Sequence, residues 1–110
     1  MRFLLLLLLA GSATPAAANR VYSGEEASAI RCSNTVAFTA VALAKAELIG
    51  QEQKDVMLGI TILILERHVS GTWREKKAAM QIMRDRRNVD DTLEDYQRNA
   101  ARCLQRFPIN

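Results

Sequence analysis

Two cysteines are the feature that most constrains how this chain can fold, because they lie far apart in the sequence. Cys32 and Cys103 are the only cysteines among the 110 residues, so one intramolecular pairing is available. A disulfide between them would close a loop of about 70 residues and stabilise the fold by roughly 4 kcal/mol. A redox pair and a pair of metal thiolates are the alternatives, but the spacing is not C-x-x-C. We therefore predict a structural disulfide.

The start of the chain has the order of a secretory signal. Arg2 supplies a positive charge, residues 3–10 are apolar, and small residues lead up to Ala18. This order predicts a signal peptide over residues 1–18, cleaved after Ala18, and a mature domain over residues 19–110. An apolar run of about eight residues is too short to span a membrane, which takes about 20.

Export carries the mature chain into an oxidising compartment, where disulfides persist. The alanine-rich leader is typical of bacteria and favours the periplasm, with full secretion as the alternative. After removal of the leader we expect no transmembrane span. The formal net charge of +3 is mild, and no basic segment with interleaved aromatic residues offers a stacking surface for bases. We therefore expect no nucleic-acid partner.

Hydrophobic periodicity predicts an all-α fold, with helices over residues 24–49, 53–68, 73–87 and 92–107. Three of the predicted starts place a capping side chain three residues before a glutamate, as in a capping box. These pairs are Ser23 with Glu26, Thr72 with Glu75, and Asp91 with Glu94. The expected architecture is a small bundle of four helices, or of five if the first helix breaks at residues 33–35.

The apolar faces of these helices predict how they pack. Cys32 lies on the apolar face of the first helix, and the last helix has one apolar stripe made of Leu93, Tyr96, Ala100, Cys103, Leu104 and Phe107. The disulfide would therefore join the first and last helices. The second helix is apolar all round, which is typical of a helix central to its domain or buried in an oligomer. On the third helix, Lys76 and Lys77 are expected on the outer face.

Few residues suggest chemistry. His68 is the only histidine, and acid–base catalysis usually needs a paired group. Met80 and Met83, with Met57 or His68, offer soft ligands for Cu(I), although methionines at this spacing are more often core residues. We predict neither catalytic residues nor a cofactor, and keep copper binding and an unrecognised enzyme as alternatives.

Arg98, Arg102 and Arg106 recur at a spacing of four residues and so share one face of the last helix. Together with the basic third helix they form a candidate anion-binding face. Glu94 stands four residues before Arg98 and offers an ordinary surface ion pair instead. A solvated helix face without a ligand is therefore the favoured interpretation, and anion binding is the alternative.

We expect the protein to be a non-enzymatic binding or interaction module. It would bind another protein through the apolar second helix or through the basic third and fourth helices. In layout the chain is also similar to the small periplasmic acid-stress chaperones, which have a leader, a helical domain near 90 residues and one disulfide. The similarity covers architecture and the two cysteines, whose separation is wider here. It implies that acid loosens the bundle and exposes the second helix, by protonating carboxylates such as Glu47, Glu52, Asp55 and Glu66.

Overall fold

The computed structural model describes residues 20–110, so the predicted leader and its cleavage site at Ala18 lie outside the described residues. The described part is all-α and contains no strand. Its four helices are α1 (Gly24–Lys45), α2 (Gln51–His68), α3 (Trp73–Asp85) and α4 (Val89–Arg106). The predicted four-helix architecture is confirmed, and α1 runs without a break through residues 33–35.

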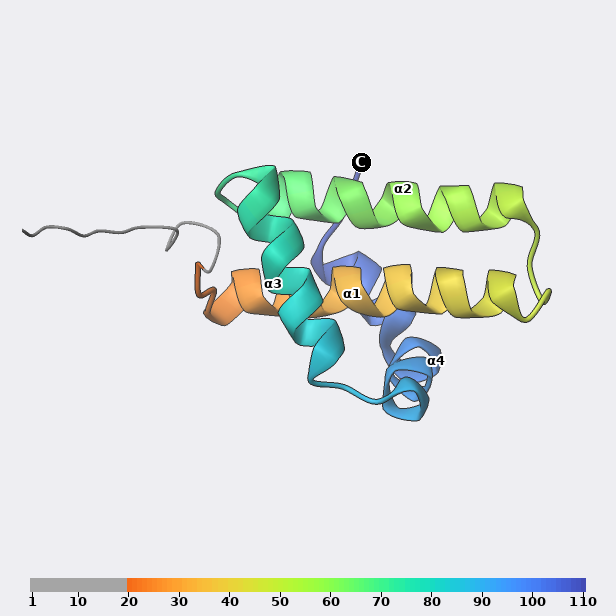
Figure 1. Cartoon of the computed structure of the whole chain (residues 1–110). Helices are drawn as coiled ribbons and strands as arrows, with labels where there is room; N and C mark the ends of the chain where they lie inside the picture. Colours follow the sequence, from red (N-terminus) through yellow and green to blue (C-terminus); the bar gives the residue numbers. More distant parts are fainter. Residues whose placement is uncertain (1–19) are drawn as a thin grey trace, which may run out of the picture.

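Helix α1 is the centre of the fold, and α2, α3 and α4 each pack against it (Figure 1). The prediction of a central second helix is wrong. Helix α2 lies beside α1 in a hairpin and buries only Thr61, Ile64 and Leu65. Alanines at positions 29 and 40 of α1 are fully buried, and such small side chains let neighbouring helices approach closely.

The disulfide between Cys32 and Cys103 joins α1 to α4, as predicted, with 5.8 Å between the two Cα atoms. The hydrophobic core lies beside it and includes Ile30, Ile64, Leu65 and Phe107. This core sits where α3 and α4 cross α1, so only one end of the α1–α2 hairpin is covered (Figure 1). The ends of α1 and α2 that are next to their connecting loop extend beyond the other helices.

The helix starts agree only in part with the predicted capping pairs. At α3, the Thr72 hydroxyl accepts a hydrogen bond from the Glu75 amide and the Glu75 carboxylate accepts one from the Thr72 amide, at 3.1 and 2.8 Å. The other two pairs are wrong. Glu26 instead accepts a hydrogen bond from the Ser70 amide at 2.6 Å. Helix α4 is capped by Asn88, whose side chain accepts from the Asp91 amide at 2.8 Å.

The turn between α1 and α2 also differs from the expectation. Helix α1 ends at Lys45 instead of continuing to residue 49, and Glu47 adopts a positive φ of 62°. Gly50 was expected to end the first helix but precedes the second. Gly50 is the N-cap residue of α2, and its amide donates a hydrogen bond to the side-chain oxygen of Gln53 at 3.0 Å. This bond satisfies a backbone donor at the start of the helix.

Within residues 20–110, α1 alone is long and apolar enough to cross a membrane by length and composition, with a mean hydropathy of 1.2. Half of its most apolar stretch is buried by the other helices. The same composition suits a helix at the centre of a core, which is the place of α1 in this fold.

Candidate functional site

An apolar groove runs between α3 and the α1–α2 hairpin, with a volume of about 530 Å³. We call it the hairpin groove. Each of the three helices contributes one face at helical spacing, since the lining residues recur three or four positions apart. They are Asn34, Ala37, Phe38 and Val41 from α1, Leu58, Thr61, Ile62 and Leu65 from α2, and Trp73, Lys77, Met80, Gln81 and Arg84 from α3.

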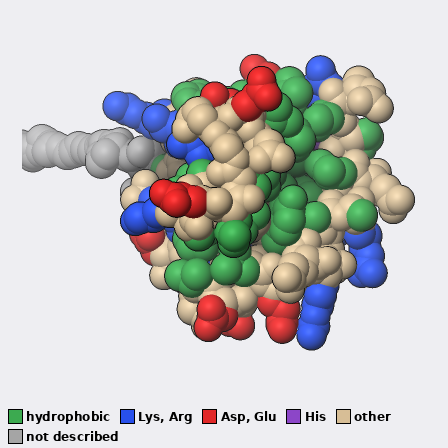
Figure 2. Space-filling view, turned by 90° about the vertical axis from the view of Figure 1, so that its right-hand side faces the viewer, with side chains coloured by type: hydrophobic (Ala, Val, Ile, Leu, Met, Phe, Trp, Pro, Cys, Tyr) green, Lys and Arg blue, Asp and Glu red, His purple; other side chains and the backbone are tan. Residues whose placement is uncertain are grey.

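The apolar surface continues from the groove over the free end of the hairpin, which we define as residues 41–62. In this segment only Thr61 is buried. Val41, Leu48 and Ile62 are 50%, 71% and 43% exposed. On the face that looks from the free end, hydrophobic side chains gather around a hollow (Figure 2). Apolar patches of this kind on a small monomer commonly mark a binding surface.

The floor of the groove contains a polar atom without a partner. Asn34 is 3% exposed, and its side-chain nitrogen Nδ2 makes no hydrogen bond to any group within residues 20–110. The hydroxyls of Ser33 and Thr39 are likewise buried without a partner, but neither residue lines a described cavity. Asn34 alone of the three lines the hairpin groove. Buried donors are usually satisfied, and this amide nitrogen is both unsatisfied and shielded from solvent beneath the lining of the groove.

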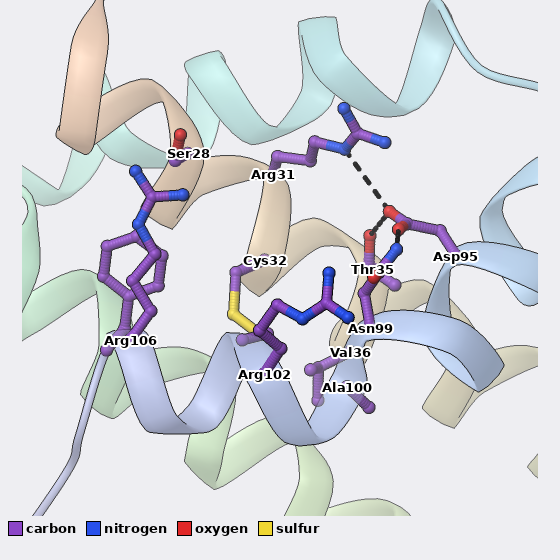
Figure 3. Close-up of a pocket in the computed structure, with 12 residues that line it drawn as sticks. Ser28, Arg31, Cys32, Thr35, Val36, Asp95, Asn99, Ala100, Arg102 and Arg106 are labelled. Atoms are coloured by element: carbon purple, nitrogen blue, oxygen red, sulfur yellow. Dashed lines mark hydrogen bonds and ion pairs between the residues drawn. A yellow bond between two sulfur atoms is a disulfide. The ribbon is translucent and has the colours of Figure 1, made fainter.

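A second cavity of about 310 Å³ lies over the disulfide, between α1 and α4. Its rim is basic: Arg31 comes from α1, and Arg102 and Arg106 reach across from α4 (Figure 3). Arg31 is paired with Asp95 and Arg106 with Glu25. This disulfide pocket therefore has little free positive charge.

The predicted anion-binding face on α4 is divided in the structure. Arg102 and Arg106 line the disulfide pocket, whereas Arg98 lies outside it and pairs with Glu94 at 3.6 Å. Two of the three arginines thus have an acidic partner. Arg102 is the one for which no ion pair is found within residues 20–110. The three side chains do not converge on one ligand position.

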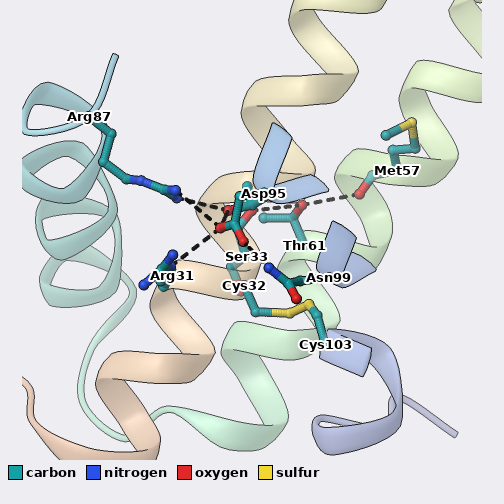
Figure 4. The surroundings of a disulfide bond; sticks show 10 residues. Arg31, Cys32, Ser33, Met57, Thr61, Arg87, Asp95, Asn99 and Cys103 are labelled. Carbon is teal, nitrogen blue, oxygen red and sulfur yellow. Dashed lines mark hydrogen bonds and ion pairs between the residues drawn. A yellow bond between two sulfur atoms is a disulfide. The ribbon is translucent and has the colours of Figure 1, made fainter. Parts of the chain in front are cut away.

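Beside the disulfide, Asp95 of α4 gathers polar groups from three parts of the chain (Figure 4). Its carboxylate accepts from Thr35 at 3.1 Å, from Arg31 at 3.3 Å and from Asn99 at 2.6 Å. Arg87, in the connection from α3 to α4, pairs with the same carboxylate at 3.1 Å and also donates to Thr35 at 3.1 Å. We call these five residues the Asp95 cluster. It was not predicted from the sequence.

The pKa of Asp95 is lowered by this cluster. Partial burial is the largest influence and by itself raises the pKa, because it disfavours the charged form. The hydrogen bond from Asn99, the charge of Arg31 and the hydrogen bonds from Thr35 and Arg31 act together in the opposite direction and outweigh it. Asp95 is therefore held as a carboxylate that ties α4 to α1.

The other candidate residues take structural positions. The Nε2 atom of His68 lies 2.7 Å from the carbonyl oxygen of Pro108, and its ring stacks edge-on with Phe107. Met80 lines the hairpin groove, but Met83 lines a different cavity. Across residues 20–110 no group of three or more His, Cys, Asp or Glu side chains could hold a metal ion.

Helix α3 buries one of the two lysines that were both predicted on its outer face. Lys76 is buried, and its ammonium donates to the carbonyl oxygen of Leu65 at 3.1 Å, at the last turn of α2. Lys77, one position later, is exposed and lines the hairpin groove. The basic side chains of α3 therefore serve two purposes, one in packing and one at the groove.

No protein-family model, curated protein or solved structure matches the chain. The hairpin groove and the disulfide pocket are the two candidate binding sites. Of the three arginines that border the disulfide pocket, Arg31 and Arg106 are already paired within the fold. The hairpin groove has an apolar lining, an unpartnered amide nitrogen at Asn34 and an exposed cation at Lys77, so it is the better candidate for a binding site.

Proposed function

We propose that this protein is a non-enzymatic binding module that works in the periplasm and binds an apolar partner in the hairpin groove. The observation that carries the proposal is the uncovered apolar surface that runs from the groove over Val41 and Ile62. A groove of about 530 Å³ is within the range of ligand-binding sites. The absence of a converging set of catalytic groups at the groove favours binding over catalysis.

The disulfide supports an extracytoplasmic place of work, because disulfides persist in oxidising compartments. Cys32 and Cys103 join helices at opposite ends of the described chain. The periplasm is the compartment we propose, on the basis of this disulfide and the leader-like sequence that precedes the domain.

Binding in the groove can be tested with 1-anilinonaphthalene-8-sulfonate, a dye that fluoresces on apolar surfaces. Trp73 is the only tryptophan of the chain and lines the groove, so its fluorescence reports binding independently. The replacement Ala37→Phe places a large side chain into the groove and should reduce dye binding about tenfold. Ala101→Phe, on the exposed side of α4, is the matched control.

Two results would contradict the proposal. One is a folded native protein that neither binds the dye nor shows a change in Trp73 fluorescence. The other is equal dye binding by the Ala37→Phe and Ala101→Phe variants, which would place the dye elsewhere. Circular dichroism of both variants checks that they keep the native helix content.

An acid-responsive chaperone is the second candidate, and one observation favours it. Three carboxylates that connect α1 to other parts of the fold, Glu25, Glu26 and Asp95, have a lowered pKa. Their protonation would release contacts around the core and enlarge the apolar surface. The carboxylates named from the sequence, Glu47, Glu52, Asp55 and Glu66, are all exposed, and the only hydrogen bond found for them is within α2, from Gln51 to Asp55.

A further inference from the structure

We infer that the hairpin groove binds a single-chain carboxylate amphiphile, that is, a fatty acid. This inference rests on the proposed binding function and adds the chemical class of the ligand. It follows from three features of the groove: a continuous apolar floor, one buried amide donor without a partner, and cations on a single wall.

The floor of the groove suits an acyl chain. Ala37, Phe38 and Val41 of α1 face Leu58 and Ile62 of α2 across it, and none of these side chains is charged. From Asn34 to Val41 the floor extends along α1 for about 10 Å, since a helix rises 1.5 Å per residue. Towards the free end, Leu48 in the turn after α1 is 71% exposed. A flexible chain can therefore lie along the hairpin towards its free end.

The buried amide at Asn34 suits an oxygen atom at the head of such a chain. Its Nδ2 is a donor that the protein leaves without a partner, although Asn34 is 97% buried, the complement of its 3% exposure. A carboxylate accepts such hydrogen bonds strongly because it is charged. Asn34 lines the groove while its Nδ2 is shielded from solvent, so an oxygen of the ligand reaches this donor only when the side chains above it move aside.

The cations that border the groove come from α3 only. Lys77 and Arg84 are both exposed and line it. Arg84 also lies 4.0 Å from the carboxylate of Asp85, a long ion pair between two exposed side chains. Asn34 of α1 lines the same cavity as these two cations. The head of the ligand would therefore meet positive charge on the α3 wall of the groove.

The distribution of charge favours a fatty acid over an acidic amphipathic helix. Among the groove residues only Lys77 and Arg84 are charged, and α1 and α2 contribute none. A partner helix presents apolar and charged side chains along its whole length, and would be matched by charges on both walls. A molecule with one anionic end and a long apolar tail needs charge on one wall only, as found here.

The inference is tested by displacing the bound dye with dodecanoate and with dodecyltrimethylammonium, both kept below their micelle concentrations. The two have the same tail and opposite charges. We expect dodecanoate to bind at least tenfold more tightly, because Lys77 and Arg84 attract its carboxylate and repel the cationic head of dodecyltrimethylammonium. Equal binding of the two, with the dye still in the groove, would overturn the fatty-acid inference and leave the proposed function standing.

Replacements at the groove sharpen the test. Lys77→Glu and Arg84→Glu should each weaken dodecanoate about tenfold and strengthen dodecyltrimethylammonium. Arg67→Glu makes the same change of net charge on a part of α2 that does not line the groove, and should leave both affinities unchanged. If Arg67→Glu weakens dodecanoate as much as Lys77→Glu does, the effect is one of net charge and the assigned head position is wrong.

Asn34→Leu separates a binding role from a structural one. Leucine has a similar volume and lacks the unpartnered donor, so the free energy of unfolding should stay equal or rise, while dodecanoate affinity falls about fivefold. Lower stability with unchanged dodecanoate affinity would show that Asn34 serves the fold instead. A peptide or protein that displaces the dye when dodecanoate does not would assign the groove to a protein partner and overturn the inference.

Discussion

The two ends of the α1–α2 hairpin are built in opposite ways. At the covered end, residues 24–40 and 63–68, polar side chains such as Ser33, Thr35 and Thr39 are buried among neighbouring helices. At the free end, residues 41–62, large apolar side chains such as Val41 and Ile62 are exposed. Polarity therefore does not decide which end of the hairpin is covered in this fold.

The difference lies in what holds each end. The covered end is fixed by the disulfide and by the Asp95 cluster, which together tie α4 to α1. Such specific contacts can hold a small domain that has a modest core. The free end needs no neighbour to stay helical, because α1 and α2 pack on each other along the hairpin. Its apolar surface is thus left available for a ligand.

The largest effect is expected from removing the disulfide. The double replacement Cys32→Ser with Cys103→Ser should lower the free energy of unfolding by about 4 kcal/mol, because the unfolded chain regains the freedom of a long loop. Urea unfolding at neutral pH measures the loss. Amide hydrogen exchange should show that α4 loses protection more than the free end of the hairpin does, since α4 is the helix that the disulfide holds.

If the double variant lost protection evenly along all four helices, the two ends of the hairpin would form one cooperative unit. The contrast between a fixed end and an independent end would then be wrong. Reduction of the native protein with a mild thiol reagent, followed by the same exchange measurement, controls for any effect of the serine side chains.

A second, smaller effect comes from two isoleucines that lie two residues apart on α2. Ile64 is 0% exposed and belongs to the core, whereas Ile62 is 43% exposed and lines the groove. Ile64→Ala should cost about 3 kcal/mol of unfolding free energy because it leaves a cavity. Ile62→Ala should cost about 0.5 kcal/mol or less, and should weaken dye binding in the groove.

Thermal unfolding of both isoleucine variants tests this contrast directly. A large loss of stability for Ile62→Ala would show that the free end contributes to the core, and the groove would then be part of the folding interior. Equal dye binding by the native protein and Ile62→Ala would argue that the dye does not contact the free end.

Much of the fold could be predicted from the sequence because local signals are strong. Apolar periodicity predicted four helices, and the count of cysteines predicted the disulfide. The central helix could not be predicted in this way, because a helix that is apolar all round looks the same whether neighbours cover it or not. Helix α2 has that pattern and is largely uncovered.

The sequence contains a pattern that indicates the Asp95 cluster, but it overlaps the predicted apolar stripe of the last helix and was not recognised. Thr92, Asp95, Asn99 and Cys103 follow at intervals of three or four residues, so they share one helix face. Because the disulfide turns Cys103 towards α1, the three polar residues must face α1 as well. The pairing of Asp95 with Arg31 and Arg87 still depends on tertiary contacts between segments more than 60 positions apart and between neighbouring elements.

The hairpin groove could not be predicted from the sequence, because it also depends on tertiary contacts. Its lining comes from α1, α2 and α3, and only their crossing brings Asn34 and Lys77 to one cavity. The sequence indicated residues 33–35 as a weak point of the first helix. In the structure these residues are among the most enclosed, because α4 and the connection after α3 satisfy Thr35.

The smallest effect at neutral pH, and the one that most sharpens the comparison, is acid sensitivity confined to the covered end. The hydrogen bond from Arg106 lowers the pKa of Glu25, and hydrogen bonds from Ser70 lower that of Glu26. In Asp95 burial acts to raise the pKa, but its hydrogen-bond and arginine partners lower it overall. All three therefore stabilise the fold above their unfolded pKa of about 4, and this stabilisation is lost as the pH falls through the lower folded values.

Hydrogen exchange measured at about pH 5 and about pH 2 should therefore show loss of protection at α4 and the first turns of α1, with the free end changed less. The triple variant Glu25→Gln, Glu26→Gln, Asp95→Asn should be less stable at neutral pH and show a flatter acid profile. The matched variant with glutamine or asparagine at positions 47, 52 and 55, all in the free end, should keep the native profile, because no hydrogen bond or ion pair from these side chains to α3 or α4 is found within residues 20–110. A native profile in the triple variant and a flattened one in the matched variant would move the acid response to the free end. An acid-responsive chaperone function would then depend on the free end of the hairpin, and the carboxylates of the covered end would not be the acid-sensitive groups.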